Sequence, residues 1–365
     1  MSYSTHKNIG VIGLGIIGRA IAANLRRKGF PVYVWNRSPR PVPNFVGSPG
    51  ELAGICDYIQ IFVSDDEALL QTVEQLSEKL TSRHVVLAHS TVAPDSMRAA
   101  AEIVERRGAQ FVEASFTGSK PAAEKGELVY YVGGTEAALR EARPILEASS
   151  KAIIEIGTVG QASAVKIATN MITAASAQAA AEALALVQAS GLPLEKFVEA
   201  MRANASYSGT LALKLPKMLD RDFEPQFSVK HMLKDMQIAS QIALSHYLDL
   251  GVTAAARDQL LEQMQWGYAD DDYSSVARKY LQEPAAAFDQ PQLDEQDGEA
   301  ASGPAITDSA ESETEKVEPK NADSADSPQP LPSFEATAGG GANETTQLRR
   351  GFLKQLLSRF SSAQE

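Results

Sequence analysis

Apolar and polar positions alternate in a regular way along the first 157 residues. An apolar segment at residues 9–12 precedes a helical pattern with Ile17, Ile21 and Leu25, and a second apolar segment follows at residues 32–35. Five more apolar segments begin at residues 58, 85, 110, 129 and 152, with helical patterns between most of them. Strands and helices that alternate at this spacing predict a doubly wound, Rossmann-type α/β domain with a parallel sheet over residues 1–159.

The pattern changes after Gly160. Apolar residues and many alanines recur at helical spacing as far as Ser190, where Gly191 and Pro193 end the helix. Further helices are predicted at residues 194–204, 211–218, 229–246 and 254–266. Because β-branched alternation is scarce here, the sequence predicts an all-α domain over residues 160–283.

Composition separates a third region from these two. The chain has a formal net charge of -12, and residues 284–346 hold 14 Asp or Glu against 2 Lys. This region is rich in Pro, Ser, Ala and Gly and nearly lacks large apolar residues, so the sequence predicts a disordered acidic linker. Residues 1–283 are then close to neutral and show no basic stripe, which predicts no nucleic-acid partner.

The segment at residues 347–362 predicts a basic amphipathic helix. Its apolar residues recur at helical spacing and are Leu348, Phe352, Leu353, Leu356, Leu357 and Phe360. Basic residues lie among them. Two interpretations remain open: the helix folds back onto the enzyme or its oligomer, or it docks on a protein partner, a protein shell or an anionic membrane surface.

Cysteine usage and hydropathy bear on the compartment. Cys56 is the only cysteine and lies in an apolar context, so disulfides within the chain and cysteine-based zinc sites are excluded, and no metal site is predicted. The first residues lack a hydrophobic signal segment, and no apolar run approaches ~18 residues. We expect a cytoplasmic protein. Recruitment to a compartment or a membrane surface through the last predicted helix is a further hypothesis that the sequence leaves open.

Three glycines follow the first predicted strand at the spacing G-x-G-x-x-G. Gly13 allows a tight turn, Gly15 lets the backbone approach a pyrophosphate, and Gly18 lets the helix pack closely on the strand. The helix then starts at Ile16 and Ile17, whose backbone N–H groups and dipole would face the phosphates. The motif therefore predicts a dinucleotide site rather than a purely structural turn.

The end of the second strand indicates which dinucleotide. An NAD site usually has a carboxylate here for the ribose hydroxyls, whereas this chain has Asn36, Arg37 and Ser38. A guanidinium and a hydroxyl can bind a 2′-phosphate, so we predict NADP(H). The alternative is that Arg37 and Arg40 are solvated surface charges.

Residues that follow the third and fourth predicted strands are expected at the same cofactor cleft, because open parallel sheets bind ligands at the carboxyl ends of their strands. These residues are Val63, Ser64 and Thr91. For the hydroxyls of Ser90 and Thr91, helix capping is an equally good interpretation. Asp65 is expected to begin the next helix.

Two further segments carry candidate chemistry. The loop at residues 114–126 contains Thr117, Gly118 and Ser119, which suit a small carboxylate, although an ordinary polar turn has the same composition. Lys166 and Asn170 lie one turn apart on the long helix. In a sheltered site Lys166 could protonate a substrate carbonyl oxygen as hydride arrives, but spacing alone favours a solvated helix residue.

Five ordered segments together resemble the β-hydroxyacid dehydrogenase family, and particularly its glyoxylate and succinic semialdehyde reductase branch. These segments are GLGIIGRAIAANL with NRS, HSTVAP, EASFTGSKPAAEKGEL, GQASAVKIATN and FSVKHMLKDMQIA. The resemblance implies a nucleotide-binding sheet domain joined by the long helix to a helical domain. That second domain would bind substrate and form homodimers or homotetramers.

The resemblance also implies roles for individual residues. Lys166 would be the catalytic acid/base, and Asn170 would orient it and the substrate. Lys234 would close the site near cofactor and substrate, with Asp235 orienting Lys234 or capping locally. The substrate carboxylate would be held by Thr117, Gly118 and Ser119.

Three positions depart from the family pattern: Ser115 replaces proline, Thr117 replaces serine, and Ala162 replaces glycine. They bear on substrate identity more than on reaction type. The sequence thus predicts NADPH-dependent reduction of a small carboxylate-bearing aldehyde or keto acid, with glyoxylate and succinic semialdehyde as first candidates. The alternatives are an imine reductase on the same scaffold and a non-catalytic NADP(H)-binding regulator.

Overall fold

A seven-stranded sheet forms the first part of the chain. The computed structural model describes residues 7–281. The strands are β1 (Ile9–Ile12), β2 (Val32–Trp35), β3 (Tyr58–Ile61), β4 (Val85–Ala88), β5 (Gln110–Thr117), β6 (Leu128–Gly134) and β7 (Ser150–Gly157). Their order across the sheet is β2-β1-β3-β4-β5-β6-β7. The chain leaves β1 toward β2 and then returns to the other side of β1, so a crevice for ligands is expected at the carboxyl ends of β1 and β3.

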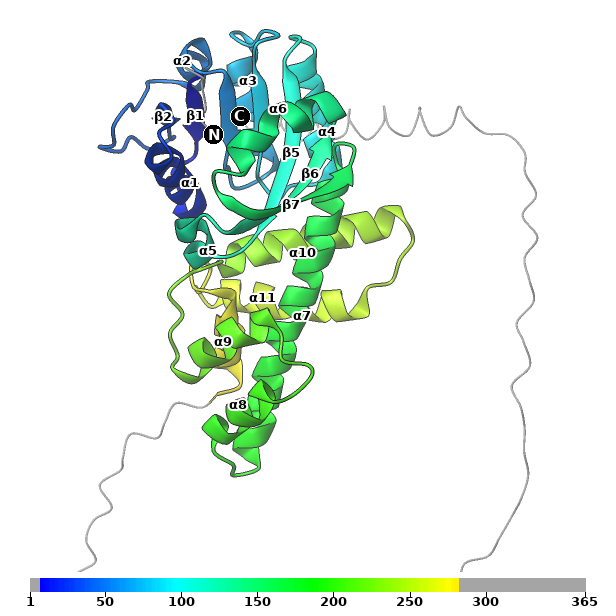
Figure 1. The fold of residues 1–365 in the computed structure, drawn as a ribbon. Helices are drawn as coiled ribbons and strands as arrows, with labels where there is room; N and C mark the ends of the chain where they lie inside the picture. The colour runs from blue at the N-terminus through cyan, green and yellow to red at the C-terminus, as the bar shows by residue number, and fades with distance from the viewer. Residues whose placement is uncertain (1–6, 282–365) are drawn as a thin grey trace, which may run out of the picture. The chain divides into compact units, whose positions relative to one another are not determined.

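Helices cover both faces of this sheet (Figure 1). Their bounds are α1 (Ile16–Arg27), α2 (Pro49–Ile55), α3 (Asp66–Ser77), α4 (Pro94–Glu105), α5 (Lys120–Lys125) and α6 (Glu136–Leu146). Alternate strand residues point to opposite faces, so Ile9 and Val11 belong to a core with α1 and α6, whereas Ile12 belongs to a core with α2, α3 and α4. Cys56, which lies in an apolar sequence context, is buried in the second core.

The expectation of an all-parallel sheet is wrong at one pair. The strands β5 and β6 are antiparallel, with Thr117 opposite Val129, while the other five neighbouring pairs are parallel. This pairing also corrects the predicted loop at residues 114–126. The ladder gives the backbone after Ala114 its hydrogen-bond partners, so β5 continues to Thr117. The helix α5 follows and ends at Lys125, with Gly126 as its C-cap at φ +74°.

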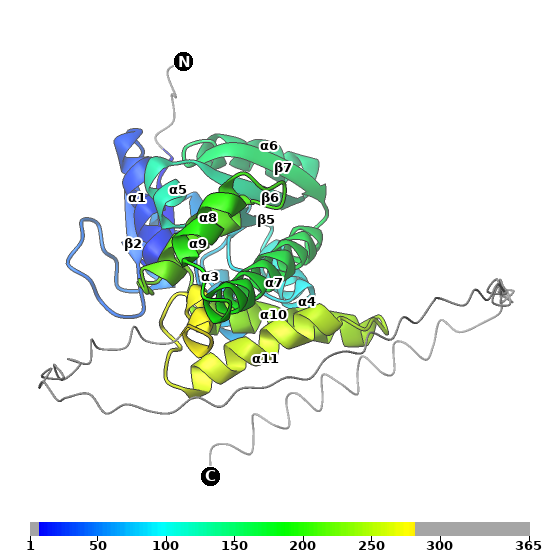
Figure 2. The ribbon, with the colours of Figure 1, turned by 90° about the horizontal axis from the view of Figure 1, so that it is seen from below.

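The second part of the chain is helical. The helices are α7 (Gln161–Ala189), α8 (Leu194–Arg202), α9 (Gly209–Leu219), α10 (Val229–Ser245) and α11 (Gly251–Gln265), followed by the 3-10 helix η1 (Tyr273–Lys279). Figures 1 and 2 show α7 running from the sheet into this part, where α10 and α11 lie against it. The sheet and the helices belong to one compact unit.

The predicted fold class, a Rossmann-type domain followed by an all-α domain, is confirmed. Across residues 7–281 no helix is long and apolar enough to cross a membrane. The acidic linker predicted at residues 284–346 and the amphipathic helix predicted at residues 347–362 lie outside the described residues.

Candidate active site

The three glycines of the first turn differ in what surrounds them. Gly13 has φ +91°, and a Cβ added to it would lie 1.9 Å from the Phe62 carbonyl oxygen. A Cβ on Gly18 would lie 1.9 Å from the Gly13 carbonyl oxygen. A Cβ on Gly15 would meet nothing within 4 Å. Packing therefore explains Gly13 and Gly18, whereas Gly15 borders open space of the kind that a bound pyrophosphate needs.

The start of α1 has the electrostatics of an anion site. Gly15 is its N-cap, and among the described residues no side chain caps this end and no acidic residue lies in its first turn. The start of α3 differs, because the Asp65 side chain accepts a hydrogen bond from the Ala68 N–H at 2.8 Å. The first N–H groups of α1, at Ile16 and Ile17, thus suit a pyrophosphate.

The end of β2 joins the glycine turn through Asn36. Its Oδ1 accepts a hydrogen bond from the Leu14 N–H at 2.9 Å, and its Nδ2 donates to the Ser38 carbonyl oxygen at 2.8 Å. Arg37 and Ser38 are exposed at the carboxyl end of the strand. Asn36 therefore fixes the turn that presents a guanidinium and a hydroxyl beside the cofactor edge.

The ends of β3 and β4 are tied to each other. The Val63 N–H donates to the Ser90 hydroxyl at 2.9 Å, and the Ser64 hydroxyl donates to the Asp65 carboxylate at 2.6 Å. Capping by the hydroxyls of Ser90 and Thr91 is not observed, because the N-cap of α4 is Ala93. As expected, the next helix starts here: Asp65 is the N-cap of α3.

A hydrogen-bonded network joins α7 to α10. The Lys166 amine donates to Asn170 Oδ1 at 2.9 Å, and Asn170 Nδ2 donates to Asp235 Oδ2 at 2.6 Å. The other oxygen of this carboxylate, Asp235 Oδ1, accepts from the Lys234 amine at 2.6 Å. Lys234 also donates to the Thr91 carbonyl oxygen, so the network ends at the carboxyl edge of the sheet.

The environment of Lys166 contradicts the solvated position that spacing alone favours. Lys166 is only partly exposed, and burial lowers the pKa of its amine from the ordinary value of 10.5 to about 8. The charge of Lys234 lowers this pKa further, while Asp235 opposes both effects. A lysine with this pKa can give and take a proton near neutral pH.

The predicted carboxylate site lies at the end of β5. Thr117 is its last residue, Gly118 follows with φ +117°, and Ser119 is the N-cap of α5, where its side chain makes no capping hydrogen bond. Thr117 and Ser119 are partly buried, and Gly118 is exposed. The helix α7, which carries Lys166, lies against β5, the strand that ends at this site.

His89 is a second titratable group near this edge, and it is unsuited to acid chemistry. It is fully buried, its Nδ1 is 2.8 Å from the Ala114 carbonyl oxygen, and its ring stacks on Phe62 with centroids 4.4 Å apart. Burial lowers the pKa of His89 to about 3, so the ring stays neutral at physiological pH.

Sequence reasoning missed Glu113. This residue lies in β5, is fully buried, and accepts hydrogen bonds from the first turn of α7. The signal was a single carboxylate within an apolar strand segment, which is unusual because buried charges require partners.

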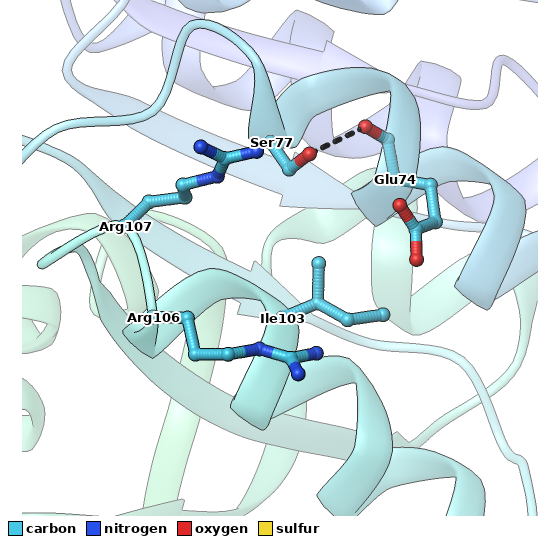
Figure 3. A pocket seen from close by; sticks show the side chains of 5 residues that line it. All are labelled: Glu74, Ser77, Ile103, Arg106 and Arg107. Atoms are coloured by element: carbon cyan, nitrogen blue, oxygen red, sulfur yellow. Dashed lines mark hydrogen bonds between the residues drawn. The ribbon is translucent and has the colours of Figure 1, made fainter.

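A cavity of about 290 Å³ lies elsewhere, between the carboxyl-terminal ends of α3 and α4 (Figure 3). Its lining residues are Glu74, Ser77, Ile103, Arg106 and Arg107. None of the predicted site residues lines it, since the strands point their carboxyl ends toward the opposite ends of these helices. Within residues 7–281 no group of three or more His, Cys, Asp or Glu could hold a metal ion.

Comparison with known proteins identifies the family. The model for the NAD-binding domain of 6-phosphogluconate dehydrogenase matches residues 8–160, and the model for the NAD-binding region of NADP-dependent 3-hydroxyisobutyrate dehydrogenase matches residues 160–280. Glyoxylate/succinic semialdehyde reductase 1 of Arabidopsis thaliana is 30% identical over 278 residues, which cover 73% of this chain and 96% of that protein. The chain belongs to the β-hydroxyacid dehydrogenase family. It is accordingly an NAD(P)-dependent hydroxyacid dehydrogenase or reductase.

Two further comparisons agree with this result, one in sequence and one in fold. The chloroplastic glyoxylate/succinic semialdehyde reductase 2 of Arabidopsis thaliana is also 30% identical, over 74% of this chain and 78% of that protein. The fold is similar to that of the Mycobacterium tuberculosis 3-hydroxyisobutyrate dehydrogenase structure with L-serine, with a TM-score of 0.68 and 24% identity over 75% of this chain and 98% of that one. The family assignment made from the five sequence segments is confirmed.

Proposed function

We propose that this β-hydroxyacid dehydrogenase reduces a small aldehyde or keto acid that bears a carboxylate, with NADPH as the reductant. Glyoxylate and succinic semialdehyde are the first candidate substrates. The observation that carries the proposal is the network from Lys166 through Asn170 to Asp235 and Lys234, which ends at the cofactor edge of the sheet. It gives an acid of suitable pKa a fixed position beside that edge.

Lys166 is the general acid of this proposal. NADPH, when bound, supplies the hydride that the carbonyl carbon receives. The Lys166 amine donates a proton to the carbonyl oxygen, and in the oxidative direction the neutral amine takes it back. One N–H of the ammonium is held by Asn170 Oδ1, which leaves the others for the substrate oxygen.

The orientation of Asn170 follows from Asp235. A carboxylate accepts hydrogen bonds and cannot donate them, so the Asn170 amide presents its NH₂ group to Asp235 and its oxygen to Lys166. Asp235 is fully buried, and the amide and the Lys234 ammonium supply the partners that a buried carboxylate requires. These contacts hold the proton donor in one geometry.

The carboxylate of the substrate is proposed to bind at the end of β5. Thr117 offers a hydroxyl, and the backbone N–H groups of Gly118 and Ser119 lie before the start of α5. Lys234 adds a positive charge on the α10 side of the site. Compared with serine, Thr117 adds a methyl group that narrows the carboxylate-binding site. A narrower site favours small acids such as glyoxylate.

The residues that follow β2 are the reason for proposing NADPH rather than NADH. Both polar atoms of the Asn36 side-chain amide are hydrogen-bonded to the backbone, so the turn that follows Asn36 has a defined shape. Arg37 and Ser38 are exposed there and suit a 2′-phosphate, and no carboxylate stands among these three residues to repel it.

Two other functions fit the structure less well. An imine reductase on this scaffold generally carries a different residue where this chain has Lys166. A non-catalytic NADP(H)-binding regulator would have no use for a lysine with a lowered pKa at the cofactor edge, and burying its network costs free energy.

One assay tests these alternatives together. NADPH oxidation is followed with glyoxylate, succinic semialdehyde, tartronate semialdehyde and a cyclic imine, each over a range of concentrations. We expect turnover with at least one carboxylate-bearing aldehyde and a much smaller kcat/KM for the imine. Oxidation only with the imine, or with none of the four, contradicts the proposed function.

A further inference from the structure

Glu113 makes a set of contacts that neither the cofactor site nor the lysine network explains. Its Oε2 accepts hydrogen bonds from the N–H groups of Gly160 at 2.6 Å and Ala162 at 3.3 Å, and its Oε1 accepts from the Ser163 N–H at 2.5 Å. All three donors lie at the start of α7, whereas Glu113 lies on β5. A side chain from a distant strand thus caps this helix.

The start of α7 lacks a cap of its own. Its N-cap is Gly160, which has φ +93° and no side chain. The first N–H groups of a helix need partners, and a negative charge is favourable at this end of the helix dipole. Glu113 supplies the hydrogen-bond acceptors and the negative charge. The N-cap residue and the first turn of α7 supply neither a side-chain cap nor an acidic residue.

The surrounding strands leave room for this carboxylate. Glu113 is fully buried, and a Cβ added to Gly133 on β6 would lie 2.9 Å from Glu113 Oε2 and 2.7 Å from the Thr158 carbonyl oxygen. Burial raises the pKa of Glu113, while the Ser163 side chain and the three N–H donors oppose this effect. Burying a carboxyl group costs free energy unless its oxygens are hydrogen-bonded. The buried Glu113 side chain is therefore stable only when β5 and the first turn of α7 keep the positions that allow these hydrogen bonds.

The two elements that Glu113 joins carry the two halves of the proposed site. Residues 113, 115 and 117 share one face of β5, so Thr117 lies ~13 Å along the same face, at a strand rise of ~3.3 Å per residue. On α7, Lys166 follows Ser163 by three residues, or ~4.5 Å along the helix axis. The bonds of Glu113 therefore link the acid to the strand that ends in the carboxylate site.

We infer that Glu113 is a positioning residue for the reaction: by anchoring the first turn of α7 to β5, it sets the place of the Lys166 amine relative to Thr117. The inference rests on the proposed reductase function. Glu113 acts here through geometry, since the charges that shift the pKa of Lys166 are those of Asp235 and Lys234.

The test compares three variants, Glu113→Ala, Glu113→Gln and Glu113→Asp, in the full-length chain. Glu155→Ala is the matched control, because Glu155 lies on the nearby strand β7 and pairs with Arg143 at an exposed position. For each protein, kcat, both KM values, the pH dependence of kcat and the Kd of NADPH are measured. Amide hydrogen exchange of residues 160–170 is measured separately, because it needs no activity.

For Glu113→Ala and Glu113→Gln we expect kcat to fall by about 10- to 100-fold, the scale of a misplacement of about 1 Å in a catalytic group. The Kd of NADPH and the pH at which reduction declines should stay unchanged, and exchange should accelerate through Asn170. Glu113→Asp, which retains the carboxylate, should recover part of kcat. The control should resemble the parent in every measurement.

Three results overturn the inference. The first is a kcat for Glu113→Ala or Glu113→Gln within twofold of that of the unmodified protein, in a variant that still binds NADPH. Glu113 would then have only a structural role, even if the variant has a lower Tm. A displaced pH limit makes its role electrostatic. Faster exchange confined to residues 160–163, with residues 164–170 unchanged, shows that the anchor does not reach Lys166. If the unmodified protein has no reductase activity, the proposed function is wrong. The hydrogen-exchange measurement still tests, without any activity, whether Glu113 holds the first turns of α7 in place.

Discussion

The glycine turn and the lysine network differ in how they are assembled. Gly13, Gly15 and Asn36 lie within one β-α-β unit, whose parts are neighbours both in sequence and in space. In the network, Asn170 and Asp235 are 65 positions apart, and Lys234 and Thr91 are 143 positions apart. The first region can form from local interactions, whereas the second exists only when the sheet and the helical part have come together.

The two regions also differ in the state of their polar groups. At the start of α1 the N–H groups are left for a ligand, and Gly15 borders open space. In the network, Asn170 and Asp235 use their polar atoms on other protein groups. A region that must bind and release a cofactor keeps its donors available, and a region that must hold one proton donor in place satisfies them internally.

The largest expected effect comes from removing the proton donor. Lys166→Ala should lower kcat by about 100-fold or more, the scale of lost general acid catalysis. The Kd of NADPH should change little, because the glycine turn and the β2 end are intact. Steady-state kinetics with the preferred aldehyde and fluorescence titration with NADPH measure the two quantities. Near-normal turnover would remove Lys166 from its proposed role.

Arg37→Ala tests the opposite region. The loss of a charge-assisted hydrogen bond to the 2′-phosphate, worth about 1.5–3 kcal/mol, should raise the KM for NADPH by about 10- to 100-fold. The KM for NADH and the pH dependence of kcat should stay unchanged. Arg140→Ala is a suitable control, since Arg140 is exposed on α6 and pairs there with Glu136. If both cofactors lost affinity equally, the proposed preference for NADPH would be wrong.

The smallest expected effect is a displaced pH limit. Reduction needs the protonated Lys166 amine, so kcat should be constant below the pKa of about 8 and fall about tenfold per pH unit above it. The Asp235 charge raises this pKa, so Asp235→Asn should move the decline to lower pH. Asp258→Asn, at an exposed pair with Arg257, serves as the control. A decline displaced to higher pH would contradict the assigned electrostatics.

Local signals were sufficient for much of the sheet part. The sequence pattern predicts β1 and β2 with the bounds found in the structure, because short buried strands of this kind can be recognised from the apolar residues within them. It fails at β5, which was predicted to end at Glu113 and continues to Thr117. The added residues owe their strand conformation to an antiparallel partner, which the periodicity of one segment does not reveal.

The candidate site shows the same limit. Gly13, Gly15 and Gly18 were recognisable from spacing, and Lys166 was not, since a lysine on a helix face usually is solvated. Its lowered pKa depends on burial and on charges carried by α10. Family resemblance supplied what the spacing could not, and neither pointed to Glu113, whose partners lie 47 to 50 positions away.

The length of α7 has a mechanical consequence. With 29 residues, the helix extends ~39 Å beyond Ser163, whereas Lys166 lies only ~4.5 Å from it along the axis. If the helix pivoted by ~5° at that end, its far end would travel ~3.4 Å and the Lys166 backbone ~0.4 Å, by the same rise per residue. A small tilt of α7 about its first turn would therefore displace its far end many times more than the proton donor.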